Sequence, residues 1–103
     1  MWKGEPTTRF HAVGSIGALG LAWWLGLERW EWFAVILMIG LVWFAEAVNT
    51  AVERLADAVT LEHHPLIGIA KDVASAAVLI VSITALIAAV IVFGPYLMEM
   101  AGN

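Results

Sequence analysis

Three long stretches without a formal charge limit what this chain of 103 residues can fold into. Residues 73–93 are a run of 21 uncharged residues, residues 11–27 a run of 17, and residues 32–45 a third run without any ionisable side chain. A helix needs about 20 predominantly apolar residues to cross a hydrocarbon core about 30 Å thick. Because 62% of the residues are hydrophobic and 14% charged, the chain is too apolar for a soluble domain of its size. These runs predict an all-α integral membrane protein with three transmembrane helices in a helical bundle.

The three helices are expected at about residues 10–27, 32–59 and 67–93 of a single domain that covers residues 1–103. A tight turn at residues 28–31 joins the first two helices, and residues 60–66 join the second to the third. Gly94 and Pro95 are expected to stop the third helix, because proline lacks the amide hydrogen that a helix interior needs. Cysteine is absent, which excludes disulfides and thiolate metal sites.

The distribution of basic residues predicts the orientation in the membrane. Lys3, Arg9, Arg54 and Lys71 fall on one side of the three spans, and Arg29 falls on the other. The positive-inside rule therefore places the amino terminus and residues 53–72 in the cytoplasm and the carboxyl terminus outside. Polar side chains from three separate parts of the sequence then meet at the cytoplasmic interface.

Charged and amide side chains continue the second apolar run without a break, at Glu46, Asn49, Glu53 and Asp57. At about 100° per residue, these four side chains share a helix face roughly 80° wide. Ionisable groups inside membrane segments are costly and usually mark a functional site. The face therefore indicates a metal and phosphate site; the plainer interpretation is the solvated end of a long helix.

The same residue types suit phosphoryl transfer, which depends on carboxylates that hold Mg²⁺, a cation on the phosphates and a base for the attacking hydroxyl. Glu5 and Glu53 supply hard oxygen ligands of the kind that Mg²⁺ prefers. Lys71 supplies the cation, and Glu46, nearest to the bilayer, the base. Lys71 alone would usually be an interfacial lysine with its ammonium in water. Neither a GxxxxGK[ST] loop nor a kinase glycine-rich loop is present, so a nucleotide site would be of another kind.

Three motifs give the chain a resemblance to a known family. They are Glu46-x-x-Asn49-Thr50-Ala51-Val52-Glu53-x-x-x-Asp57, then Glu62-x-His64-x-x-x-Gly68-x-Ala70-Lys71-Asp72, and, more weakly, Trp2-Lys3-Gly4-Glu5-Pro6-Thr7-Thr8-Arg9. In this order and spacing they resemble the small bacterial diacylglycerol kinases, a family that includes the undecaprenol kinases. Together the motifs cover nearly the whole chain.

The resemblance implies a homotrimer of three-helix protomers with active sites shared between neighbours. It also implies ATP and Mg²⁺ as cosubstrates and a membrane lipid alcohol, diacylglycerol or undecaprenol, as acceptor. By motif, Glu46 is expected to be the general base, and Asn49 to organise the site. The expected cofactor-binding residues are Glu5 and Glu53, which are also the metal pair, together with Arg9, Asp57, Lys71 and Asp72.

The sequence departs from the family pattern in three places, one of which is the aromatic Phe10, which follows Arg9 where members usually have a Phe before it. Members usually carry an amphipathic surface helix before the tryptophan, whereas Met1 directly precedes Trp2 here, which bears on lipid access and activity. They commonly carry a basic residue at the position of Ile69, and losing that cation would weaken phosphate binding. His64 and His11 resemble the undecaprenol branch, and the segment from Ser75 resembles the diacylglycerol branch, so the acceptor stays open.

Two other classes of protein compete with a lipid kinase. A small proton-coupled transporter would use one membrane carboxylate, but that carboxylate is expected nearer to the middle of the bilayer than Glu46. A catalytically impaired membrane scaffold is the second alternative, motivated by Ile69 and the start at Met1. Substrate flux in proteoliposomes without ATP would indicate the transporter, and a stable trimer that binds neither ATP nor Mg²⁺ would indicate the scaffold.

Overall fold

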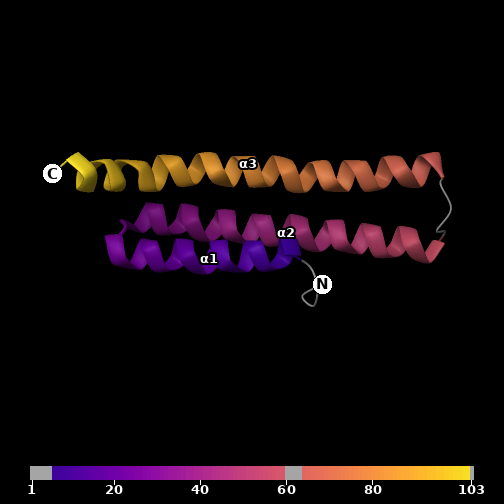
Figure 1. Ribbon diagram of the computed structural model, residues 1–103, viewed down its shortest axis with the longest axis horizontal. Helices are drawn as coiled ribbons and strands as arrows, with labels where there is room; N and C mark the ends of the chain where they lie inside the picture. Colours follow the sequence, from indigo (N-terminus) through magenta and orange to yellow (C-terminus); the bar gives the residue numbers. More distant parts are fainter. Residues whose placement is uncertain (1–5, 60–63, 103) are drawn as a thin grey trace.

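The computed structural model describes residues 6–59 and 64–102 as three α-helices, α1 (Pro6–Leu25), α2 (Arg29–Val59) and α3 (Pro65–Gly102). The helices α2 and α3 run antiparallel and contact each other along their length, whereas α1 lies beside the amino-terminal part of α2 (Figure 1). The molecule is elongated, with extents of 58 × 23 × 22 Å. The predicted all-α fold is confirmed.

Two helices in the described part of the chain, α2 and α3, have the length and apolar composition to cross a membrane. Large apolar side chains also cover the outer faces of all three helices; Trp23 is 81% exposed and Ile80 63%. Soluble monomers rarely expose large contiguous apolar patches. A membrane environment accounts for this surface, because lipid chains then take the place of a protein core.

The turn between α1 and α2 is set by Gly26, which ends α1 in a left-handed conformation with φ of 68°. The amide of Leu27 donates to the carbonyl of Ala22 at 3.3 Å, and the amide of Gly26 donates to the carbonyl of Trp23 at 3.3 Å. These two bonds form the Schellman motif, which satisfies carbonyls at a helix end. Because of this motif, α1 ends at Leu25 and not at the predicted residue 27.

The start of α2 is fixed by Glu31, whose carboxylate reaches back over the first turn. The Glu31 Oε1 atom accepts the backbone amide of Glu28 at 2.8 Å, which satisfies a free donor of the helix start as in a capping box. The same oxygen accepts the hydroxyl of Tyr96 from α3. This cap starts α2 at Arg29, three residues before the predicted start, and it buries Glu31.

The predicted stop of α3 at Gly94 and Pro95 is wrong, since α3 continues through Pro95 to Gly102. A proline ring clashes with the Cβ of the preceding residue when that residue is helical, and Gly94 has no Cβ. The continuation also brings Tyr96 to Glu31 on α2. The rule that proline ends a helix therefore does not hold here, where the continued helix makes a contact with α2.

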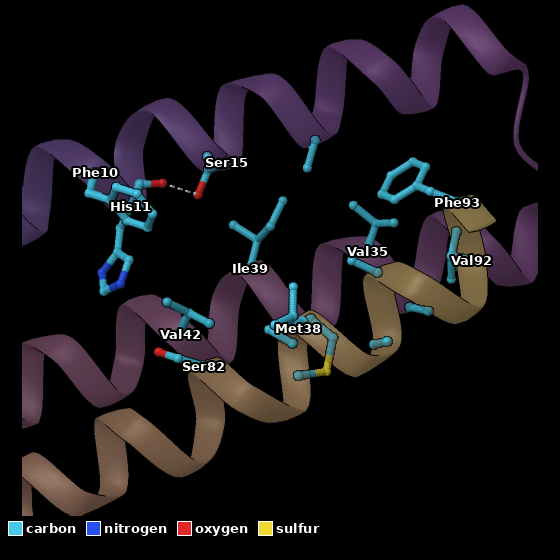
Figure 2. A pocket seen from close by; sticks show the side chains of 17 residues that line it. Phe10, His11, Ser15, Val35, Met38, Ile39, Val42, Ser82, Val92 and Phe93 are labelled. Atoms are coloured by element: carbon cyan, nitrogen blue, oxygen red, sulfur yellow. Dashed lines mark hydrogen bonds between the residues drawn. The ribbon is translucent and has the colours of Figure 1, made fainter. Parts of the chain in front are cut away.

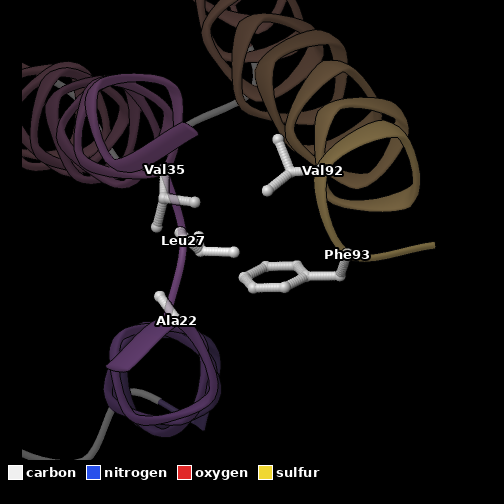
Figure 3. Close-up of a cluster of buried hydrophobic side chains, with 5 residues drawn as sticks. All are labelled: Ala22, Leu27, Val35, Val92 and Phe93. Carbon is white, nitrogen blue, oxygen red and sulfur yellow. The ribbon is translucent and has the colours of Figure 1, made fainter. Parts of the chain in front are cut away.

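The buried core lies at the same end of the molecule and joins all three helices. Figure 3 shows the ring of Phe93 extending from α3 toward Leu27, with Val92 beside it. Ala22 and Val35 complete the cluster from α1 and α2. This core fixes the end of the bundle that is opposite to the predicted site.

The other end of α3 begins at Pro65, two residues before the predicted start. Proline is favoured in the first helical turn because its missing amide hydrogen would have no helical partner there. The backbone carbonyl of His64 accepts a hydrogen bond from the amide of Gly68 at 2.9 Å. The ring Nδ1 atom of His64 accepts one from the amide of Leu66 at 3.2 Å. His64 thus caps α3.

Candidate active site

The deepest polar pair of the candidate site joins α1 to α2. The Nδ1 atom of His11 lies against Oε2 of Glu46, an ion pair when the imidazole is protonated. The two side chains are only 13% and 8% exposed. The ring of Trp43 meets the His11 ring edge-on, with centroids 6.4 Å apart. Glu46 is therefore a buried carboxylate that lies against an imidazole nitrogen from another helix.

One turn along α2, Asn49 and Glu53 form the next pair. The Nδ2 atom of Asn49 donates to Oε1 of Glu53 at 3.2 Å. The Asn49 Oδ1 atom is buried and has no hydrogen-bond partner among the described residues. A buried acceptor without a donor is costly. Asn49 therefore carries an unsatisfied buried oxygen, and the exposed carboxylate of Glu53 lies beside its amide nitrogen.

The outermost pair joins the end of α2 to the start of α3. The Nζ atom of Lys71 donates to Oδ1 of Asp57 at 2.8 Å. Lys71 lies before the uncharged run at residues 73–93. Its hydrogen bond to Asp57 raises the pKa of the ammonium, and the negative charge of Glu53 raises it further. Lys71 therefore carries a full positive charge at neutral pH.

These three pairs lie at different depths along α2. Asp57 follows Glu46 by eleven residues, which is about 16 Å along the helix axis at 1.5 Å per residue. Burial decreases in the same direction, from the buried Glu46 through the half-buried Asn49 to the exposed Glu53 and Asp57. A ligand that contacts both ends of this face must extend across it from the membrane to water.

Comparisons with known proteins identify the family of this chain. The sequence profile described as prokaryotic diacylglycerol kinase matches residues 1–93. The chain belongs to the prokaryotic diacylglycerol kinase family. It is 34% identical over 100 residues to an undecaprenol kinase of Bacillus subtilis, which covers 94% of this chain and 81% of the relative. It is 37% identical over 86 residues to a diacylglycerol kinase of Escherichia coli, which covers 84% of this chain and 70% of the relative.

A third family member has a similar sequence identity to this chain. A diacylglycerol kinase of Helicobacter pylori is 33% identical over 99 residues, which covers 96% of this chain and 74% of the relative. Both kinds of lipid kinase thus occur among the relatives, at similar identity.

Most of the predicted site residues lie at one end of the molecule. Glu46, Asn49, Glu53 and Asp57 lie along α2 as their spacing predicts, and Lys71 joins them through Asp57. Arg9 and Asp72 are exposed, on α1 and α3, and neither makes an ion pair within residues 6–59 and 64–102. The remaining predicted residue, Glu5, lies outside the described residues.

The predicted metal pair can be judged from Glu53 alone, since its partner Glu5 lies outside the described range. Within that range, no group of three or more His, Asp or Glu side chains gathers in a way that holds a metal. The unpartnered Asn49 Oδ1 and the carboxylate of Glu53 are nevertheless the hard oxygen donors that Mg²⁺ prefers. The donor set fits Mg²⁺ that also takes ligands from water or phosphate.

An apolar groove of about 300 Å³ runs beside the deepest pair, between α1 and the α2–α3 pair. Figure 2 shows its lining, with His11 and Ser82 at one end and Phe93 near the other. Its other labelled residues are Phe10, Ser15, Val35, Met38, Ile39, Val42 and Val92. The groove places a long apolar surface next to the polar residues of the site.

The contact between His11 and Glu46 was not predicted from the sequence. Helix periodicity relates residues of one helix and does not say which face meets a neighbour. The short turn at residues 26–28 was the available signal, because it forces α1 and α2 to run antiparallel and brings residues at similar distances from the turn to similar depths.

Proposed function

We propose that this protein transfers the γ-phosphoryl group of ATP to the hydroxyl of a membrane lipid alcohol, with Mg²⁺ and with Glu46 as general base. The observation that carries this proposal is the graded face of α2, which leads from the buried Glu46 to the exposed Asp57. A lipid kinase needs this gradient, because its acceptor comes from the membrane and its donor from water. Membership of the diacylglycerol kinase family supports the same activity.

The reaction forms a bond between the acceptor oxygen and the γ-phosphorus. The bond from the γ-phosphorus to the oxygen that bridges it to the β-phosphate breaks, and ADP leaves. The acceptor hydroxyl loses its proton to a carboxylate oxygen of Glu46. A positioned general base of this kind contributes about 10²- to 10⁴-fold to a rate. Glu46 suits the role because it is the polar residue of α2 closest to the apolar groove among the four on this face.

The remaining residues hold the nucleotide in place. Lys71 brings a positive charge that neutralises phosphate oxygens, and Asp57 holds the ammonium on the site side of α3. Asn49 Oδ1 and Glu53, with Glu5, are the proposed ligands of Mg²⁺, which supplies neutralisation of the charge on the phosphates. We also assign Arg9 and Asp72 to nucleotide binding, because their family motifs match.

The apolar groove suits the lipid acceptor. Diacylglycerol and undecaprenol both carry a hydroxyl at the head of a long apolar body, and the groove presents apolar side chains from all three helices. Its end at His11 lies at the level of Glu46. A lipid chain in this groove would bring its hydroxyl to the base without leaving the membrane.

We also propose that α1 crosses the membrane as a third span and that the protein is a homotrimer with shared sites. The amino terminus then faces the cytoplasm and the carboxyl terminus the outside of a bacterial inner membrane. Within one protomer, Lys71 contacts Asp57, about 16 Å along α2 from Glu46. A neighbouring protomer that packs against this face would enclose the site.

The decisive experiment measures transfer of labelled phosphate from ATP by purified protein in mixed micelles, with diacylglycerol and undecaprenol offered separately. We expect label in at least one lipid, and a loss of about 10²- to 10⁴-fold in kcat in Glu46→Gln, which keeps the shape of the side chain. Glu99→Gln is the matched control, since Glu99 is exposed near the end of α3. Full activity in Glu46→Gln would refute the assigned base, and no transfer by the wild type would refute the kinase.

A further inference from the structure

Glu46 has a partner from α1 that the proposed reaction does not yet use. The Nδ1 atom of His11 lies against Oε2 of Glu46, and both side chains are almost fully buried. Figure 2 shows the His11 side chain extending from α1 toward the facing helices at one end of the apolar groove. The contact therefore lies at the point where the groove meets the proposed base.

The imidazole lies beside a link between α1 and α2. The ring of Trp43 packs edge-on against it, with an angle of 73° between the ring planes. The backbone carbonyl of His11 accepts the hydroxyl of Ser15 at 2.7 Å. The Ser15 Oγ atom in turn accepts Nε1–H of Trp43 at 3.0 Å, so that the same serine ties α1 to α2. His11 thus presents its Nδ1 atom to Glu46 from a fixed position.

The chemistry of the pair suits the control of a carboxylate. An imidazole with hydrogen on Nδ1 donates to a carboxylate in the neutral and in the protonated state. Hydrogen bonds that involve an ionised group are shorter and stronger than neutral ones. Such a donor fixes the rotation and depth of a carboxylate, as a partner residue does for the base of a catalytic triad.

We propose that His11 is a positioning residue, which holds the Glu46 carboxylate in the orientation that accepts the proton of the lipid hydroxyl. This role rests on the proposed lipid kinase reaction. The Nδ1 donor on α1 also makes the packing of α1 against α2 a condition for catalysis. A residue of α1 thus controls the base on α2 without touching the nucleotide.

Three substitutions separate positioning from packing. His11→Leu keeps much of the volume and removes the donor, and we expect kcat to fall about 10- to 100-fold, with the KM for ATP within about twofold of wild type. His11→Asn places an amide donor near the position of Nδ1 and should recover most of the loss. His11→Gln carries its donor one bond farther along the side chain and should recover less.

Leu27→Ala is the matched control, because it removes buried packing at the turn between α1 and α2, at the end of the bundle opposite to the contact with Glu46. A purely structural role of His11 predicts that Leu27→Ala and His11→Leu both lower the thermal stability in detergent and change kcat alike. Positioning predicts that kcat falls in His11→Leu and not in Leu27→Ala. An unchanged kcat in His11→Leu, with the wild type active, overturns the proposal and leaves the kinase intact.

A spectroscopic measurement tests the contact without any activity. The ¹⁵N resonance of Nδ1 in labelled wild-type protein, assigned by its absence in His11→Asn, should shift in Glu46→Gln and stay in place in Glu99→Gln. A resonance that does not move in Glu46→Gln overturns the contact and the positioning role. If the resonance shifts but the wild type phosphorylates neither lipid, the proposed function fails, and the positioning role fails with it.

Discussion

At the scale of single residues, the site is organised by how much water each polar side chain reaches. Glu46 is buried beneath α1, Asn49 is half-buried, and Glu53 and Asp57 are exposed. A base that acts on a lipid hydroxyl belongs in the buried position, where electrostatic interactions are stronger because the local dielectric is low. Ligands for a phosphate and its cation belong in the exposed positions, because the nucleotide arrives from water.

Lys71 gives a prediction that concerns nucleotide binding alone. Lys71→Met removes the charge, and because hydrogen bonds to charged groups carry substantial binding energy, we expect the KM for ATP to rise about 10- to 100-fold. The KM for the lipid should change little. Steady-state kinetics with each substrate varied in turn measure both constants.

Arg54→Gln is the control for Lys71→Met, because it removes a positive charge from the exposed part of α2 near the same end of the molecule. We expect wild-type constants in Arg54→Gln. An equal rise in the KM for ATP in both variants would mean that Lys71 acts only through the overall charge of this face.

At the scale of helices, the sequence predicted which segments are helical and misplaced where they end. Long uncharged runs are sufficient to predict which segments are helical, because a helix satisfies every backbone hydrogen-bonding group inside a membrane. The ends depend on features that periodicity does not contain: the left-handed Gly26, the cap by Glu31, and Pro95 after a glycine. Tyr96 contacts Glu31 only because α3 continues past Pro95. A rule based on neighbouring residues in the sequence could not predict this contact.

The left-handed Gly26 predicts a large difference between two identical substitutions. Gly26→Ala forces a Cβ into a conformation with φ of 68° and should lower the free energy of unfolding by about 1–2 kcal/mol. Gly40→Ala lies inside α2, with nothing within 4 Å of the added Cβ, and should raise the free energy by about 0.5–1 kcal/mol. Unfolding in mixed micelles followed by circular dichroism measures both, and equal effects would contradict the role of the turn.

The site was predictable in part for the same reason. Spacing along one helix was enough to group Glu46, Asn49, Glu53 and Asp57, since helix geometry alone decides which residues share a face. The partner of Glu46 was not predictable in this way, because the contact with His11 depends on how α1 is rotated against α2. The pairing of Lys71 with Asp57 likewise depends on the register between α2 and α3.

At the scale of the whole molecule, one protomer leaves much of its functional face uncovered. Glu53 and Asp57 are exposed, and the apolar groove lies between α1 and the α2–α3 pair, where α1 lies beside only the amino-terminal part of α2. Three helices of this kind make a poor enclosure for a nucleotide and a lipid together. A second protomer that packs against this face would exclude water from the reacting groups, which strengthens every electrostatic interaction there.

Mixed oligomers test whether neighbouring protomers share the site. If each site takes Glu46 from one subunit and Lys71 from the next, oligomers of Glu46→Gln and Lys71→Met subunits contain some sites with both wild-type residues. In a cyclic trimer that contains both kinds of subunit, one of the three sites has both wild-type residues, so we expect roughly a third of the wild-type activity per site in oligomers isolated on both tags. Each variant alone should be nearly inactive at low ATP concentration.

The measurement is phosphate transfer by co-refolded subunits that carry two different affinity tags and are isolated on both tags in succession. Mixed oligomers without recovered activity would mean that each protomer builds its site from its own Glu46 and its own Lys71.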